Sequence, residues 1–382
     1  MNKAQPFFDR KKIRFVLFLS LCISAWLIYK NFSTPHFIPA ENGNYTWIDA
    51  NSNQQLEADE MHVDTENGSF KKVGVWEIMQ TISWNGPLIY GLLTALLFMI
   101  GRDFFYILRI KLLTNNELTW KRSTIVILLW EFASALSPGV VGGASVAMFI
   151  LNREKIALGR STAIVVITAW MDNLFYVVMI PFVFFFIDRN DLFPQNISFQ
   201  QPVELVFWTG FGIILLVCLL LFLSLFFFPN LITRFLSFLF RLAFLKKWRP
   251  QAIQTGKDLE IAAHIFRTES MGYWIKVFCF TLGSWISRYL VINALFAAFL
   301  SISFLDHIQI LGKQLVLWLF MLVSPTPGGS GVAEFAFQHL LHEFSSDLVI
   351  LTLIILIWRL ISYFPYLLIG LFILPKWLGQ KE

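Results

Sequence analysis

The hydrophobic residues of this 382-residue chain gather into long apolar runs separated by shorter polar segments. The runs cover roughly residues 13–29, 84–101, 123–150, 161–187, 204–228, 274–300, 308–342 and 348–374. A helix of about 20 residues crosses the roughly 30 Å of hydrocarbon in a bilayer. Hydrocarbon offers no water to backbone amides, so such runs predict membrane helices, and the alternation typical of membrane β-strands is absent.

Composition narrows the class of protein further. The chain is 57% hydrophobic and 14% charged, whereas a soluble domain carries about 25% charged residues. Its three cysteines, Cys22, Cys218 and Cys279, all lie inside apolar runs and show no metal-binding spacing. No glycine-rich nucleotide motif or nucleophile elbow is present. We therefore expect an integral membrane protein with no cofactor, no metal and no nucleic-acid partner.

The positive charges predict how the chain is threaded. Segments 1–14, 102–122, 152–160, 229–273 and 375–382 hold 22 of the 30 lysines and arginines. The positive-inside rule places these segments, and both termini, in the cytoplasm of a cell (inner) membrane protein. Residues 1–30 are then an N-terminal transmembrane helix. Residues 31–83, which are rich in Asp and Glu, form an acidic extracytoplasmic insertion to which the sequence assigns no fold.

Two runs conflict with simple crossings, because each has both of its ends on one side of the membrane. The run 123–150 contains SPGVVGG at 137–143, and the run 308–342 contains SPTPGGSG at 324–331. Proline and glycine interrupt helices, and each half of about 14 residues reaches only about 21 Å. We therefore predict about six transmembrane helices plus two re-entrant hairpins, entered from opposite sides and forming an inverted repeat. The alternative is two ordinary kinked helices with coincidentally similar loops.

Charged residues inside the runs are the first candidates for a functional site, because a charge at membrane depth is costly and usually faces a partner or a cavity. They are Glu131, Asp172, Arg288, Glu334 and Arg359. We expect Arg288 or Arg359 to lie near Glu334, Glu131 or Asp172, either as an internal ion pair or as a phosphate-binding group. Glu334 has a second interpretation, as a capping residue of the helix that follows the glycines. The stretch 101–111 mixes aromatic and basic residues and is interpreted as an interfacial amphipathic helix.

The motifs around the second break resemble a known family. Ser324-Pro325-Thr326-Pro327-Gly328-Gly329-Ser330-Gly331-Val332-Ala333-Glu334 is similar to its proline–glycine signature. Trp358-Arg359-Leu360-Ile361-Ser362-Tyr363-Phe364-Pro365-Tyr366 is similar to its last-helix pattern, and Pro138-Gly139 with Gly142-Gly143 resembles a looser first break. The family is the flippase-like membrane region of lysylphosphatidylglycerol synthases. The resemblance implies a flippase-like membrane domain over about residues 84–375. After it we see no room for the soluble aminoacyl-transfer domain, so we expect no synthase activity from this chain alone.

The resemblance implies a lipid translocase that moves a polar lipid or lipid-linked head group between leaflets, alone, as a homo-oligomer or with a partner synthase. The alternatives are a membrane enzyme acting on lipid-linked substrates, with Glu334 or Asp172 as a base, and a scaffold for a lipid-modifying enzyme. No catalytic residue is assigned. The expected substrate-binding residues are Glu334, Arg359, Arg288, Glu131, Asp172, Pro138, Gly139, Gly142, Gly143, Pro325, Pro327, Gly328, Gly329 and Gly331.

Overall fold

The structure is a computed structural model that describes most of the chain after residue 35. The described residues are 36–48, 60–74, 77, 80, 84–137, 139–193, 197–228, 230–239, 249–323, 329, 332–345 and 348–379. The predicted N-terminal helix over 1–30 therefore lies outside the described residues.

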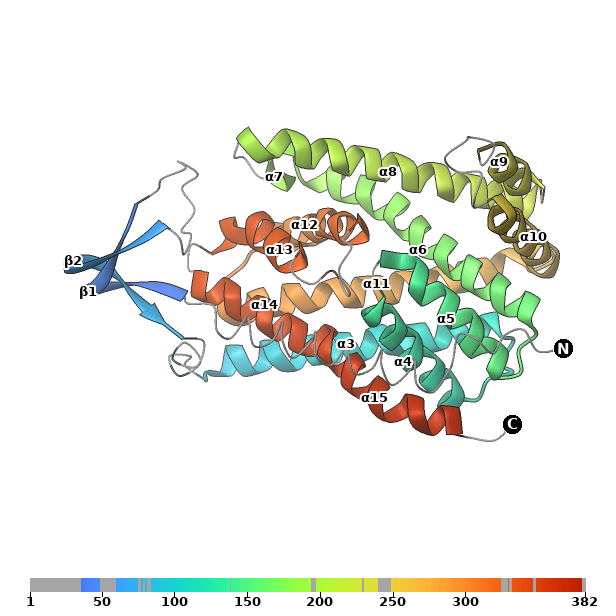
Figure 1. Cartoon of the computed structure of the whole chain (residues 1–382), viewed down its shortest axis with the longest axis horizontal. Helices are drawn as coiled ribbons and strands as arrows, with labels where there is room; N and C mark the ends of the chain where they lie inside the picture. Colours follow the sequence, from blue (N-terminus) through green and yellow to red (C-terminus); the bar gives the residue numbers. More distant parts are fainter. Residues whose placement is uncertain are drawn as a thin grey trace.

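A two-stranded sheet forms part of the acidic insertion. Strand β1 (His36–Trp47) pairs antiparallel with β2 (Met61–Val73), so that His36 lies opposite Val73 and Trp47 opposite Met61. At the end of the ribbon where the chain passes from β1 to β2, the Trp47 indole Nε1 donates to Glu60 Oε2 at 3.0 Å. Figure 1 shows this sheet beyond one end of the helices. We had assigned no fold to this insertion, whereas the predicted helical nature of the membrane part is confirmed.

Among the described residues, five helical segments are long and apolar enough to cross a membrane. They are α3 (Gly86–Leu113), α6 (Leu158–Phe186), residues Val203–Phe226 of α8 (Ile197–Phe226), α11 (Met271–Phe299), and residues Ile350–Gly379 of α14 (Leu348–Ser362) and α15 (Phe364–Gly379). These segments match five of the six runs for which we predicted simple crossings. In Figure 1 they run along the long axis of the molecule.

Shorter helices fill the two runs predicted to be broken. The first contains α4 (Trp120–Leu136) and α5 (Gly139–Arg153). The second contains α12 (Phe304–Val323) and α13 (Val332–Leu341), followed by the 3-10 turn η4 (His342–Phe344). In Figure 1 the first pair lies in the half away from the sheet and the second pair in the half next to it. That placement fits re-entrant segments from opposite sides, which remain a prediction. The remaining helices are α7 (Arg189–Leu192), α9 (Leu231–Leu239) and α10 (Arg249–Phe266).

The extent of the first break was predicted wrongly. Helix α5 begins at Gly139, so Gly139, Gly142 and Gly143 lie in helical backbone and not in a loop over 137–143. A Cβ atom on Gly143 would lie 2.4 Å from Ser134 Oγ of α4. Gly143 therefore allows α4 and α5 to approach closely and is not there to break a helix. Pro138 lies outside the described residues.

In the second break only Gly329 is described. Its φ of +66° is a left-handed conformation that glycine adopts without steric cost. Pro325, Pro327, Gly328 and Gly331 lie outside the described residues.

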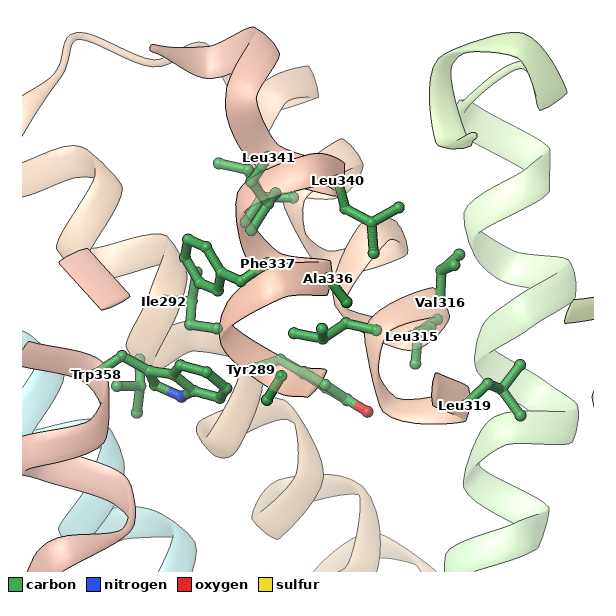
Figure 2. Packing of buried hydrophobic residues seen from close by; sticks show 14 of the residues in the cluster. Tyr289, Ile292, Leu315, Val316, Leu319, Ala336, Phe337, Leu340, Leu341 and Trp358 are labelled. Atoms are coloured by element: carbon green, nitrogen blue, oxygen red, sulfur yellow. The ribbon is translucent and has the colours of Figure 1, made fainter. Parts of the chain in front are cut away.

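Helix α13 is buried inside the protein. Figure 2 shows Ala336, Phe337, Leu340 and Leu341 packed towards α11, α12 and α14. The Phe337 ring stacks on Phe296 of α11 and on Trp358 of α14, with centroids 6.1 and 5.6 Å apart. A short helix at membrane depth is tolerated where protein surrounds it, and this packing supplies that surrounding.

Helices α3 and α11 approach each other through small residues. A Cβ atom on Gly91 would lie 2.3 Å from Ala298 Cβ, 2.8 Å from its Cα and 3.0 Å from the Ala294 carbonyl oxygen. Ala95 on the next turn is fully buried. Small residues of this kind let membrane helices pack closely. Such packing stabilises their association because the hydrophobic effect does not drive helices together inside lipid.

We expect Gly91→Ala to destabilise the protein by about 1–3 kcal/mol, because the added methyl group meets backbone atoms that cannot rotate away. Gly212→Ala in α8 is the matched control, since nothing lies within 4 Å of its added Cβ and alanine favours a helix by about 1 kcal/mol over glycine. Thermal unfolding of both variants in detergent tests this; equal midpoints would contradict the close packing.

We also expect cysteines placed at Lys121 and Asn152, which flank α4 and α5, to react with an impermeant thiol reagent from the same side of the membrane. Both ends of a re-entrant pair return to one surface. A cysteine at Lys71, on the exposed part of β2, should report the other side. Opposite labelling of Lys121→Cys and Asn152→Cys would show that the α4–α5 segment crosses the bilayer.

Candidate functional site

One face of α3 carries two arginines on either side of a tyrosine. Arg102, Tyr106 and Arg109 follow at intervals of four and three residues, which places them on the same side of a helix. The guanidinium carbons of Arg102 and Arg109 lie 4.9 and 4.8 Å from the centroid of the Tyr106 ring. The ring therefore separates the two cations while attracting both. The stretch 101–111 is the last part of α3 and not a separate helix, and its position at a membrane interface stays a prediction.

Arg102 joins α3 to α4 and α15. Its guanidinium forms an ion pair with Glu131 of α4 and a second one, at 3.2 Å, with Asp103. It also donates to the Tyr366 hydroxyl of α15 at 2.7 Å, and that hydroxyl lies 2.8 Å from both Asp103 carboxylate oxygens. The Arg102 side chain is only 1% exposed. A cation so deeply buried needs these partners, because losing its hydration costs several kcal/mol.

Arg109 makes a corresponding junction with α6 and α11. Its Nη1 lies 2.6 Å from Asp172 Oδ1 and donates to the Thr281 hydroxyl at 3.0 Å. The same Asp172 oxygen accepts a hydrogen bond of 2.9 Å from the Trp285 indole of α11. The Arg288 guanidinium lies over the Trp285 ring, 5.2 Å from its centroid. Three arginines and three carboxylates thus lie near one another between the helices, with no formal net charge.

A pocket opens between α3, α4 and α6 next to both ion pairs. Its empty space, mouth included, is about 380 Å³. The lining residues are Tyr106, Arg109, Ile110, Ile127, Trp130, Glu131, Thr168 and Asp172.

The polar groups around this pocket are unequally exposed. The side chains of Glu131 and Asp172 are 22% and 25% exposed, while Arg102 and Arg109 behind them are 1% and 6% exposed. The Thr168 hydroxyl is buried and has no hydrogen-bond partner among the described residues. The pocket therefore offers carboxylate edges, a guanidinium and a free hydroxyl to a polar ligand.

The structure brings some of the predicted residues together and leaves others apart. Glu131 and Asp172 line the pocket, and Arg288 lies close to it. Arg102 and Arg109, which were not among the candidates predicted from the sequence, pair with Glu131 and Asp172. Arg359 is buried on α14, with its guanidinium 4.8 Å from the Trp358 ring centroid and 5.3 Å from that of Tyr363. Glu334 lies in the first turn of α13, and its side chain lies outside the described residues, so the expected proximity of Arg288 or Arg359 to Glu334 stays a prediction.

Sequence reasoning missed Arg102, Asp103, Arg109, Thr168 and Tyr366. The apolar run was ended at residue 101, but α3 continues to Leu113. The arginine–tyrosine–arginine spacing on one helix face was a signal that these residues share a buried environment. Thr168 gives no such signal, because a single threonine in an apolar helix is common. Among the described residues, no group of three or more His, Cys, Asp or Glu side chains is placed to hold a metal.

The long apolar helices and the buried layer of paired charges define a multi-pass membrane protein with a polar site between its helices. Comparison with known proteins gives the family. The model of the lysylphosphatidylglycerol synthase transmembrane region matches residues 69–370, and the chain belongs to this family. It is also 23% identical over 305 residues to a UPF0104 membrane protein of Archaeoglobus fulgidus, an alignment that covers 77% of this chain and 87% of the relative. No solved structure matches the chain.

We expect Arg102→Met to lower the free energy of unfolding by about 3–5 kcal/mol, because it leaves buried carboxylates without their cation. Arg122→Met is the matched control. The Arg122 side chain is 54% exposed and lies 3.5 Å from Glu154, and such surface pairs contribute about 0–1 kcal/mol. Denaturant unfolding in detergent measures both variants. A loss at Arg102 no larger than that at Arg122 would show that the charge layer does not hold α3, α4 and α15 together.

Proposed function

We propose that this protein translocates a polar lipid or lipid-linked head group between membrane leaflets. The observation that carries the proposal is the pocket at membrane depth, where Arg109, Glu131, Asp172 and the unpartnered Thr168 hydroxyl line one space. Ionisable residues inside a membrane commonly mark a substrate pathway. The family, named for synthases of an aminoacylated phospholipid, supports a lipid substrate.

The charge arrangement suits a group that carries both phosphate and positive charge. A guanidinium binds a phosphate through charge-assisted hydrogen bonds. The partly exposed carboxylates of Glu131 and Asp172 accept hydrogen bonds from an amine or a hydroxyl. Arg102 neutralises Glu131, and Arg109 neutralises Asp172. A head group then exchanges one set of charge partners for another and need not enter an unbalanced site.

The second broken segment enters the proposal as an untested part of the path. Arg359 is buried on α14, and Glu334 belongs to α13, which follows that break. We include both with the proline and glycine positions of the two breaks as residues that a moving head group contacts. The double variant Glu334→Gln with Arg359→Met distinguishes a structural role from a role in transport. If the two residues only neutralise each other, the double variant should regain both folding and activity. If they contact head groups, it should fold but remain inactive.

The enzyme alternative has Glu334 or Asp172 as the base that takes a proton from a substrate. Asp172 is held by Arg109 and by the Trp285 indole, and the Glu334 side chain lies outside the described residues. The two functions differ in a deletion strain. Loss of translocation changes the distribution of lipids between leaflets at unchanged total composition, while loss of an enzyme or of its scaffold removes a lipid species.

The direct test is leaflet exchange by the purified protein in unilamellar vesicles. Fluorescent phospholipids with zwitterionic, anionic and cationic head groups are incorporated, and an impermeant quencher reports the fraction in the outer leaflet. Exchange of at least one head group faster than in protein-free vesicles is expected. Rates equal to those of protein-free vesicles for all three, together with a missing lipid species in the deletion strain, would favour the enzyme.

We expect Thr168→Val to slow this exchange about fivefold, the effect of losing one hydrogen bond of about 1 kcal/mol to the head group. The free energy of unfolding of the Thr168→Val protein should not fall, because the Thr168 hydroxyl has no partner among the described residues. Thr162→Val, on the same helix, removes a hydroxyl that donates to the Leu158 carbonyl at 3.1 Å outside the pocket. It should leave exchange unchanged. Equal exchange rates for the two variants would remove Thr168 from the head-group site.

A further inference from the structure

A second feature of the fold begins at the pocket and runs along one face of α11. Thr281, Trp285, Tyr289 and Asn293 are spaced four residues apart, so they form a line along the helix. At 1.5 Å per residue this line is about 18 Å long. Its polar and aromatic members all contact residues of other helices, and the kind of contact changes along it.

At the end near the pocket, the line meets the arginine–carboxylate layer. Thr281 accepts a hydrogen bond from Arg109, and Trp285 donates one to Asp172. At the other end, it meets buried amides. Gln314 of α12 donates to the Tyr289 carbonyl at 3.1 Å and to Asn293 Oδ1 at 3.0 Å. Asn293 in turn donates to the His307 carbonyl at 2.7 Å. Polar groups thus continue beyond the pocket towards the end of the molecule that carries the sheet.

Between these two ends, aromatic rings from three helices close the line. The Tyr176 ring of α6 stacks on Trp318 of α12, with centroids 3.8 Å apart and planes at 17°. The Tyr176 hydroxyl lies 2.5 Å from that of Tyr289, and Trp285 meets Trp318 edge-on at 5.9 Å. Figure 2 shows the Tyr289 side chain extending from α11 towards α12. We call Tyr176, Trp285, Tyr289 and Trp318 the aromatic partition.

We propose that the α11 line is the path of the head group and that the aromatic partition is its closed barrier. This inference rests on the proposed function. The partition lies directly between the polar groups of the pocket and those of Gln314 and Asn293, so a polar group passes only when the rings separate. Trp318 belongs to α12, which ends at Val323 next to the second break, while Tyr176 and Tyr289 belong to the longer helices α6 and α11. A displacement of α12 therefore parts the Tyr176–Trp318 stack without moving either spanning helix.

The test compares Trp318→Ala with Trp208→Ala. Trp208 is a matched control, because it also stacks on an aromatic ring, that of Phe184 at 5.3 Å, but lies 41% exposed on α8 away from the line. The reporter is Thr168→Cys in the pocket, in a chain whose three native cysteines are replaced by alanine. Small impermeant methanethiosulfonates are applied from each side of the membrane, with Lys71→Cys as the reference for the side of the sheet.

With the partition intact, and in the Trp208→Ala protein, Thr168→Cys should react only from the side opposite the sheet. In Trp318→Ala it should react from both sides. Labelling that stays one-sided or absent in Trp318→Ala, or two-sided labelling with the partition intact, overturns the barrier. If Trp318→Ala does not purify as a single species, Trp318→Leu, which keeps apolar bulk without the stacked ring, replaces it under the same criteria.

Leaflet exchange supplies a second measurement. Trp318→Ala should exchange head groups about 2- to 10-fold faster than the parent protein, the factor that corresponds to losing one aromatic pair. Unchanged or slower exchange in an active protein contradicts the barrier. Side-dependent labelling as expected, with no exchange in any variant, leaves the barrier standing and rejects the lipid translocase.

Discussion

The burial of two arginines on one face of α3 constrains the rest of this structure. Arg102 and Arg109 are buried in a helix that is long enough to span a membrane, and burying a charge without a partner is costly. Each draws a carboxylate from another helix, Glu131 from α4 and Asp172 from α6. Arg102 also holds Tyr366 of α15, and Arg109 holds Thr281 of α11. The positions of four helices around α3 are therefore tied to the neutralisation of two cations.

This electrostatic frame also explains why the pocket is polar without being unstable. In both pairs the cation is almost fully buried and the carboxylate reaches the open space. The same arrangement recurs near the sheet, where Lys313 of α12 is 1% exposed and its partner Glu343, at 2.8 Å, is 35% exposed. A buried cation fixes the position of each carboxylate, so the acidic edge is preorganised and a ligand need not order it on binding.

The sequence was sufficient for the long helices, since their apolar runs exceed the length needed to cross a bilayer. It also indicated that Glu131 and Asp172 are unusual. Their partners Arg102 and Arg109 were missed, because the ends of the apolar runs were set by hydrophobicity and not by helix periodicity. The hydrophobic run ends before Arg102, although α3 continues to Leu113. The sequence overestimated the first break because glycine has two uses: Gly143 provides room for Ser134 of the neighbouring helix and leaves the backbone helical. The sheet escaped prediction because polar strands outside the membrane carry no strong pattern.

Trp285 connects the two halves of the proposed mechanism. Its indole shares Asp172 Oδ1 with Arg109, and its ring meets Trp318 of the partition. An amine or hydroxyl bound at Asp172 competes with the indole for the same oxygen. In the mechanism we propose, losing that hydrogen bond removes one of the contacts that hold the Trp285 ring against Trp318, while its packing on Phe175 and Tyr176 stays. The proposal thus couples occupancy of the pocket to opening of the path through one carboxylate.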